Sequence, residues 1–181
     1  ENPLWTYTVP SAGCVGSAAI NGNMVYFGDS DNKLYSLDTE NGALLWNFTG
    51  DDNMGRVTHV FGNGSVYAGA ESKSVYALNA ENGYLLWTKE LCGFEVNDLA
   101  INTELNILYV LCTYELFAVH GINGNIIWTI DDVLENEFAA SVVLGNNGSL
   151  YAQLNGSYMY MNIIFYYTFC NMLYLLLSLL I

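Results

Sequence analysis

The sequence contains very few basic residues. Lysine and arginine together account for 4 of its 181 residues, against 18 aspartates and glutamates, and the formal net charge is −14. Proteins that bind nucleic acid gain their affinity from clustered lysine and arginine side chains. The composition therefore argues against a nucleic-acid partner. It predicts an acidic surface that keeps the protein soluble or meets a cationic or calcium-bearing partner.

Helical periodicity is also missing over most of the chain. Before residue 162, no stretch of ten or more residues places apolar side chains at three- and four-residue spacing, which excludes tandem helical repeats. Short apolar runs occur instead, such as Met24 to Phe27 and Leu34 to Leu37, separated by Asn, Asp, Gly and Ser. This punctuation is typical of β-strands and turns.

The arrangements that would hold a metal or carry out catalysis are incomplete. Residues 29–32 (Asp-Ser-Asp-Asn) place oxygen ligands at alternating positions, but the Gly and Glu that complete a calcium loop do not follow. We therefore predict a hairpin turn there. His59 and His120 have no partners at metal-binding spacing, so we predict structural or exposed roles for both. No nucleophile, base and orienting group recur together, so no catalytic or metal-binding residue is predicted.

No two cysteines are adjacent. Cys14, Cys92, Cys112 and Cys170 are all isolated in the sequence. Four cysteines permit three pairings if they are oxidised, and the sequence does not choose among them.

A repeat of constant length organises the chain. The four tryptophans, Trp5, Trp46, Trp87 and Trp128, are equally spaced. A fixed period of roughly 40 residues is typical of solenoids and propellers. An Asn-Gly pair precedes each of the last three tryptophans, at 41–42, 82–83 and 123–124. Such pairs tolerate the positive φ that tight hairpin turns require.

Four strands per unit and radial repetition predict a β-propeller. Each tryptophan falls on the last strand of its blade, where its wide ring can pack against the neighbouring sheet. The predicted fold is all-β: a partial propeller of four-stranded antiparallel blades over residues 1–161, with about three complete blades plus parts. The segment Leu4 to Tyr7 is predicted to be a fourth strand whose first three are absent, which favours a processed chain or a piece of a longer protein.

The segment Ser36-x-Asp38-x-x-x-Gly42-x-x-x-Trp46 resembles the tryptophan-docking repeat of the pyrroloquinoline-quinone (PQQ) type propellers, with copies at 77–87 and 118–128. The resemblance covers residues 4 to about 160. It implies a docking role for the four tryptophans and for Gly42, Gly83 and Gly124. The family includes quinoprotein dehydrogenases, the barrel-assembly lipoprotein of bacterial outer membranes, and luminal domains of membrane proteins.

Three functions fit this resemblance. The favoured one is a non-catalytic module that binds other proteins or acts as a scaffold and holds no cofactor. The second is a fragment of a PQQ-dependent dehydrogenase, but those enzymes carry adjacent cysteines over the quinone and a calcium site. Here the cysteines are isolated and Arg56 is the sole arginine. The third is the luminal sensor domain of a membrane protein.

Alignment of the repeats identifies five residues near the axial opening of the propeller, where such folds usually meet their ligands. These candidate rim residues are Arg56, Glu95, Asn97, Asp98 and Glu137.

Four sequons for N-glycosylation are present. They begin at Asn47, Asn63, Asn147 and Asn155. Such sites suit a secreted, periplasmic or luminal chain, so an exported protein is predicted.

The repeat pattern breaks after residue 161. Residues 162–181 include an uncharged apolar run from Ile163 to Ile181, which as a helix would just span the ~30 Å of a bilayer core. Two hypotheses remain open: a membrane anchor, or non-native sequence translated from an A/T-rich non-coding stretch such as a retained intron. A strand in a blade is not expected, because the propeller offers this run no place.

Overall fold

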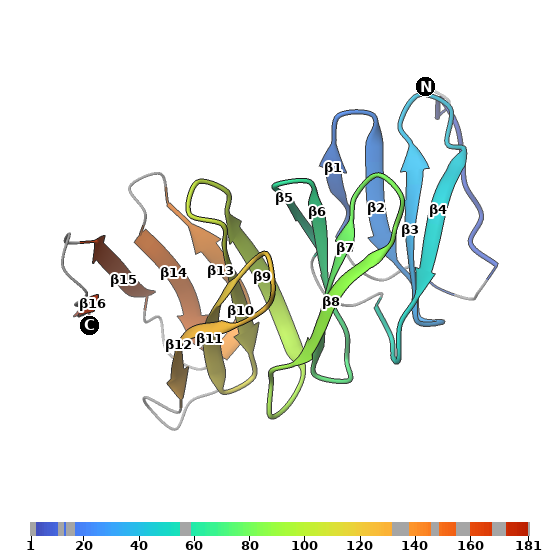
Figure 1. Cartoon of the computed structure of the whole chain (residues 1–181). Coiled ribbons are helices and arrows are strands. Elements are labelled where there is room, and N and C mark those ends of the chain that lie inside the picture. The colour runs from blue at the N-terminus through green and yellow to red at the C-terminus, as the bar shows by residue number, and fades with distance from the viewer. Residues whose placement is uncertain are drawn as a thin grey trace.

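The computed structural model describes residues 3–10, 13, 17–54, 59–131, 138–145, 149–154, 160–167 and 173–180. All regular structure in these ranges is β-structure (Figure 1). The strands of the first two sheets are β1 (Ala19–Asn21), β2 (Met24–Gly28), β3 (Lys33–Asp38), β4 (Leu44–Thr49), β5 (His59–Gly62), β6 (Ser65–Gly69), β7 (Ser74–Asn79) and β8 (Leu85–Glu90). Those of the next two are β9 (Val96–Asn102), β10 (Ile107–Cys112), β11 (Glu115–His120), β12 (Ile126–Asp131), β13 (Phe138–Leu144), β14 (Ser149–Leu154), β15 (Tyr160–Tyr167) and β16 (Leu173–Leu180).

These strands form four antiparallel sheets of four consecutive strands each, as predicted for propeller blades. The first sheet has the order β1-β2-β3-β4, and the other three repeat this order. The sheets follow one another along an arc (Figure 1). Each sheet is therefore one blade, and the blades are numbered here in chain order.

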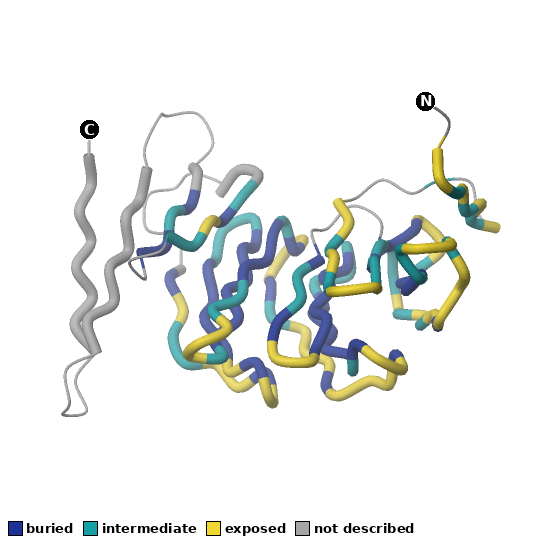
Figure 2. The backbone as a smooth tube through the Cα atoms, turned by 90° about the horizontal axis from the view of Figure 1, so that it is seen from above, coloured by how far each residue is buried: buried dark blue, intermediate teal, exposed yellow. Residues whose placement is uncertain are grey.

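The hydrophobic core lies between neighbouring blades. One cluster joins Tyr67 and Trp87 of the second blade to Leu99 and Leu108 of the third, and similar clusters join the first to the second blade and the third to the fourth. The middle strands are covered on both faces, so β6 and β10 are buried along their whole length. The outer strand β8 is exposed except at Trp87. Figure 2 shows where the buried and the exposed residues lie along the backbone.

The turn between the third and fourth strands of each of the first three blades is built from local bonds. Asp38 Oδ1 accepts the amides of Glu40 and Asn41 at 2.8 and 3.2 Å, and Gly42 then takes a φ of +73°. Gly83 and Gly124 repeat this conformation with φ of +72° and +67°. The Asn-Gly pairs thus form the predicted tight turns, because glycine adopts positive φ without a steric penalty.

The prediction of a strand at Leu4 to Tyr7 is wrong: this described segment has no regular structure. A strand needs a partner for its backbone groups, and the described part of the chain contains no earlier strands of that blade.

The expectation that a blade has no place for the apolar tail is also wrong. The described parts of this run form β15 and β16, which pair with each other and complete the sheet begun by β13 and β14. Two physical reasons favour this arrangement over a helix. Ile, Phe and Tyr favour strands, and β14 would otherwise present an unpaired edge. Among the described residues, no helix is long and apolar enough to cross a membrane.

Candidate functional site

The repeated tryptophans join each blade to the next. Trp46 Nε1 donates a hydrogen bond to the Ala80 carbonyl at 2.9 Å, and its ring lies flat against the turn at Gly83. A Cβ added at Gly83 would stand 2.6 Å from Trp46 Cε3, so the ring occupies the space of a side chain. Trp5 and Trp87 make the equivalent contacts. Their indoles donate to the carbonyls of Thr39 and Gly121 at 2.8 Å each and pack against Gly42 and Gly124.

A tyrosine on the second strand completes two of these joints. The Tyr26 hydroxyl donates to the same Ala80 carbonyl at 3.3 Å, and Tyr67 donates to the Gly121 carbonyl at 3.3 Å. Burial raises the pKa of both tyrosines, so they remain protonated donors. Sequence reasoning missed this role. Its signal was the Val-Tyr pair at 25–26 and 66–67, which has the same period as the tryptophans.

Trp128 on β12 lies 6.0 Å from the ring of Tyr109 between centroids, close to the 6.1 Å between Tyr67 and Trp87. Each earlier tryptophan packs against the glycine that lies a fixed number of residues after it in the sequence. The residue at that position after Trp128 is Phe165. Trp128 is half-buried, whereas Trp46 and Trp87 are each 8% exposed.

The segments between blades are fastened by acidic side chains. Asp51, which follows β4, accepts hydrogen bonds from the hydroxyls of Ser72, at 2.7 Å, Ser74, at 3.3 Å, and Tyr76. Burial alone would raise the pKa of Asp51, but these hydrogen bonds outweigh it and hold the pKa below its ordinary value. The segment after the first blade is thereby attached to the second.

Asp29 has a similar role in the turn between β2 and β3. It is fully buried, accepts the amides of Asp31 and Lys33 at 2.9 Å, and accepts the Tyr35 hydroxyl at 2.8 Å. Residues 29–32 thus form the predicted hairpin turn. Tyr35 and Tyr76 occupy the same position in successive repeats, and Phe117, which has no hydroxyl, takes that position in the next one.

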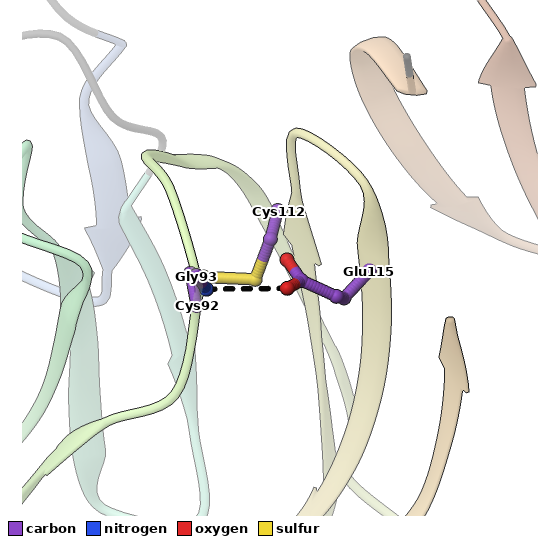
Figure 3. Close-up of a disulfide and its surroundings, with 4 residues drawn as sticks. All are labelled: Cys92, Gly93, Cys112 and Glu115. Atoms are coloured by element: carbon purple, nitrogen blue, oxygen red, sulfur yellow. Dashed lines mark hydrogen bonds between the residues drawn. A yellow bond between two sulfur atoms is a disulfide. The ribbon is translucent and has the colours of Figure 1, made fainter. Parts of the chain in front are cut away.

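A disulfide fastens the segment between the second and third blades (Figure 3). It joins Cys92, which holds the repeat position of Asp51, to Cys112 at the end of β10, with Cα atoms 5.6 Å apart. Both cysteines are buried, and the Gly93 amide beside them donates to Glu115 Oε1 at 3.3 Å. A covalent bond therefore takes the place of the tyrosine–aspartate bond where Phe117 cannot make one. Cys14 and Cys170 lie outside the described residues.

The candidate rim residues do not share one environment. Glu95 is exposed and Asn97 is half-buried, but Asp98 is 6% exposed. Its carboxylate accepts the amides of Leu99, at 2.9 Å, and Val142, at 2.8 Å, and so links β9 to β13. Asp98 therefore acts between blades and presents little surface to a ligand. Arg56 and Glu137 lie outside the described residues.

His59 is buried at the start of β5, and its Nδ1 lies 3.2 Å from the Ser17 carbonyl. Burial lowers the pKa of His59 to about 4, although hydrogen bonding to the backbone of Ser17 and Met54 partly opposes this. The ring is therefore neutral at pH 7. His120 is exposed at the end of β11. Within the described ranges, no group of three or more His, Cys, Asp or Glu side chains could hold a metal ion.

The two described sequons differ in geometry. Asn47 is exposed on the outer strand β4. Asn63 is exposed in the tight turn between β5 and β6, where it has a φ of +53° and donates through Nδ2 to the Thr103 carbonyl at 2.9 Å. Asn147 and Asn155 lie outside the described residues.

The outer strands expose apolar side chains at the same repeat position. Leu44, Leu85 and Ile126 are 44%, 45% and 54% exposed, and each stands two positions before a docking tryptophan. Leu45 and Leu86, the neighbouring residues, are also exposed. Single exposed apolar side chains are common, but a repeated row of them is typical of surfaces that bind other proteins.

Comparison with known proteins gives one family. The sequence profile of the family described as outer membrane protein assembly factor BamB matches residues 2–91 and 50–159. No curated protein matches the sequence.

Several solved structures share the fold. BamB from Moraxella catarrhalis is similar with a TM-score of 0.73 and 16% identity, covering 88% of this chain and 48% of that one. The chain therefore spans about half the length of that BamB chain. The computationally designed Ika4 protein has a TM-score of 0.71 and 20% identity, covering 86% of this chain and 93% of its own. The designed Ika8 protein has a TM-score of 0.64 and 21% identity, and the match covers 76% of this chain and 42% of the Ika8 chain.

Proposed function

Because the chain belongs to the PQQ-like repeat propeller family of outer membrane protein assembly factor BamB, we propose that it is a non-catalytic module that binds another protein. The observation that carries this proposal is the row of exposed apolar side chains on the outer strands, at Leu44, Leu85 and Ile126. An assembly factor acts on other proteins, and repeated apolar residues on a rigid array suit that task.

The arrangement of the polar residues supports a non-catalytic role. Groups with shifted pKa values often mark catalytic sites. Here they have structural partners: Asp51 binds Tyr76 and two serines, Tyr26 and Tyr67 bind backbone carbonyls, and His59 lies against Ser17. The exposed apolar row therefore offers a better basis for function than these groups do.

The Cys92–Cys112 disulfide supports an exported location. Structural disulfides persist mainly in secreted, periplasmic and luminal proteins, where the surroundings are oxidising. The exposed sequon at Asn47 fits the same compartments.

Cross-linking in the native compartment tests this function. The tagged chain should recover at least one protein reproducibly after cross-linking and mass spectrometry. The designed Ika4 protein, which shares the fold at 20% identity, is a matched control and should recover none. A partner common to both proteins, or none for the chain, would contradict a specific binding function.

A second assay tests the enzymatic alternative. The purified chain, supplied with pyrroloquinoline quinone and calcium, should give no dye-linked oxidation of alcohols or sugars. Calcium-dependent turnover that requires the quinone would establish a dehydrogenase instead.

A further inference from the structure

We propose that one side of the first three blades binds a basic segment of a partner protein, and that an apolar side chain of this segment enters a pocket on the third blade. The proposal rests on the protein-binding function proposed above. The surface is called the hairpin side. It comprises the turns between the first and second strands and between the third and fourth strands of each blade, together with the residues next to them. In an antiparallel sheet these two turns lie at the same end, as Figure 1 shows for the first two blades.

Most of the large exposed apolar side chains gather on the hairpin side. They are Ile20, Leu44, Leu45, Tyr84, Leu85, Leu86, Leu105, Ile122 and Ile126. Docking between blades brings them closer, because Trp46 beside Leu45 packs against Gly83 beside Tyr84. In the same way, the contact of Trp87 with Gly124 brings Leu86 close to the turn between the third and fourth strands of the third blade. The apolar residues of successive blades thus follow one another along the arc, as in a surface that binds an extended partner.

A pocket of about 240 Å³ opens on this side of the third blade, lined by Leu105, Asn106, His120, Ile122 and Asn123. Two of these residues depart from the repeat. His120 stands where Asp38 and Asn79 cap the same turn with their side-chain oxygens. Ile122 stands where the other blades have Glu40 and Glu81.

These departures change the chemistry of the turn. Ile122 is 78% exposed and Leu105 is 48% exposed, so two apolar side chains border the opening. Asn106 also lines the pocket, and its Oδ1 is buried without a hydrogen-bond partner. The two apolar side chains at its opening therefore suit the pocket to a large apolar side chain.

Charge indicates that the partner is basic. Glu40, Glu81 and Glu104 are exposed in the hairpin-side turns. Among the described lysines, Lys89 reaches this side, where its stem lies against Gly124. Lys33 begins β3 and Lys73 directly precedes β7, so both lie at the opposite end. The full chain carries a formal net charge of −14. Lysine or arginine beside the apolar anchor would complement this field and speed association.

Fluorescence anisotropy with three labelled decapeptides tests the proposal on the full chain. The first alternates leucine and lysine, the second serine and lysine, and the third leucine and glutamate. The leucine–lysine peptide should bind about tenfold more tightly than either of the others, since it alone supplies both apolar anchors and positive charge.

Two variants locate the site. A double variant that replaces the two apolar residues of the pocket, Leu105→Ser with Ile122→Ser, should bind the leucine–lysine peptide about tenfold more weakly. The matched control is Phe94→Ser, which removes a 56% exposed apolar side chain at the opposite end of the blades and should change the affinity less than about twofold. Circular dichroism of each variant establishes that its sheets are intact.

Equal affinity for the leucine–lysine and serine–lysine peptides would overturn the proposal, as would equal weakening by Phe94→Ser. The native partner separates this outcome from failure of the proposed function. If cross-linking recovers that partner equally with the wild type and with the pocket variant, protein binding stands and the hairpin side is not its surface. If the wild type recovers no partner at all, the proposed function itself fails.

Discussion

At the scale of single residues, the docking glycines serve two purposes. The turn requires positive φ, and the indole of the preceding blade fills the space where a Cβ would stand. Gly64 also has positive φ, at +76°, but no indole packs against it, since no atom lies within 4 Å of an added Cβ. Backbone strain and loss of docking can therefore be measured separately.

We predict that Gly83→Ala destabilises the protein more than Gly64→Ala. Both variants should lose about 1–2 kcal/mol to the left-handed backbone. Gly83→Ala should lose roughly 1–3 kcal/mol more, because its methyl group overlaps the Trp46 ring. Urea unfolding monitored by tryptophan fluorescence gives both free energies. Equal losses would show that the ring yields without cost.

His59 predicts a dependence of stability on pH. Its pKa is about 4 in the folded protein and 6.5 in the unfolded chain, so the unfolded state binds the proton first. The stabilisation from the neutral ring is complete above pH 6.5 and is lost as the pH falls toward 4, with a total of roughly 3 kcal/mol. The His59→Gln variant should lack this part of the profile. Replacement of the exposed His120 by Gln is the control and should preserve it.

The two described sequons predict different outcomes in a eukaryotic secretory host. Asn47 should carry a glycan, because its side chain is exposed on a strand. Asn63 should not, since its amide binds Thr103 within a tight turn. Mass spectrometry before and after glycosidase treatment reads both sites. Asn47→Gln should remove the enzyme-sensitive mass, whereas a glycan found on Asn63 alone would contradict this assignment.

At the scale of elements, the segments that link blades are fastened by different chemistry at the same repeat position. Asp51 binds Tyr76 and two serines of the second blade, while Cys92 is bonded to Cys112 of the third. Each bond attaches the chain leaving one outer strand to the body of the next blade. The covalent version should contribute more, because it also restricts the unfolded chain.

We predict that loss of the Cys92–Cys112 disulfide lowers the free energy of unfolding by about 3 kcal/mol, as expected for a loop of this length. The measurement compares the wild type with a Cys92→Ala, Cys112→Ala variant by urea unfolding, both in a background with Cys14→Ser and Cys170→Ser. A reducing agent should destabilise the first protein and leave the second unchanged. An equal response of both would argue against this pairing.

The sequence predicted the elements whose signal is local or periodic. The apolar middle strands and the Asn-Gly turns follow from alternation, turn chemistry and the period of the repeat, and the structure confirms them. Leu4 to Tyr7 and the tail were predicted wrongly because their conformation depends on whether a strand lies beside them. A local pattern does not contain that information.

The site was less predictable than the fold. Asp98 lies where the repeat alignment puts it along the chain. Its burial, however, depends on a hydrogen bond with Val142, which is 44 residues further along the chain. The role of Tyr26 and the cysteine pairing likewise depend on which residues meet across a blade interface. The period identifies equivalent positions in successive blades without giving the contacts that each of them makes.

At the scale of the whole molecule, each described core cluster joins two neighbouring blades. Stability in such an array is close to a sum of terms for the units and for their interfaces. In the sequence, the docking pattern does not continue beyond Trp128, because Phe165 and Phe169 stand where the repeat predicts Gly and Trp.

Two hypotheses for residues 162–181 remain open: a membrane anchor, and sequence that is not native coding sequence. On the second, a processed transcript should skip their codons and resume with a polar loop, an Asn-Gly pair and a tryptophan. Sequencing the transcript across the codons for residues 155–181 and comparing it with genomic DNA tests this. A transcript that retains the apolar run and then stops would support the alternative of a membrane anchor.

The joint between blades has a direction. The first and second blades each contribute an indole at one face and receive one at the other, through a carbonyl and a glycine that lie at the same distances further along the chain. A unit cut at any equivalent point therefore carries one complementary half of a joint at each end. Units could be reordered, duplicated or fused in the same sense without redesigning an interface, whereas a unit inserted backwards would fit neither neighbour.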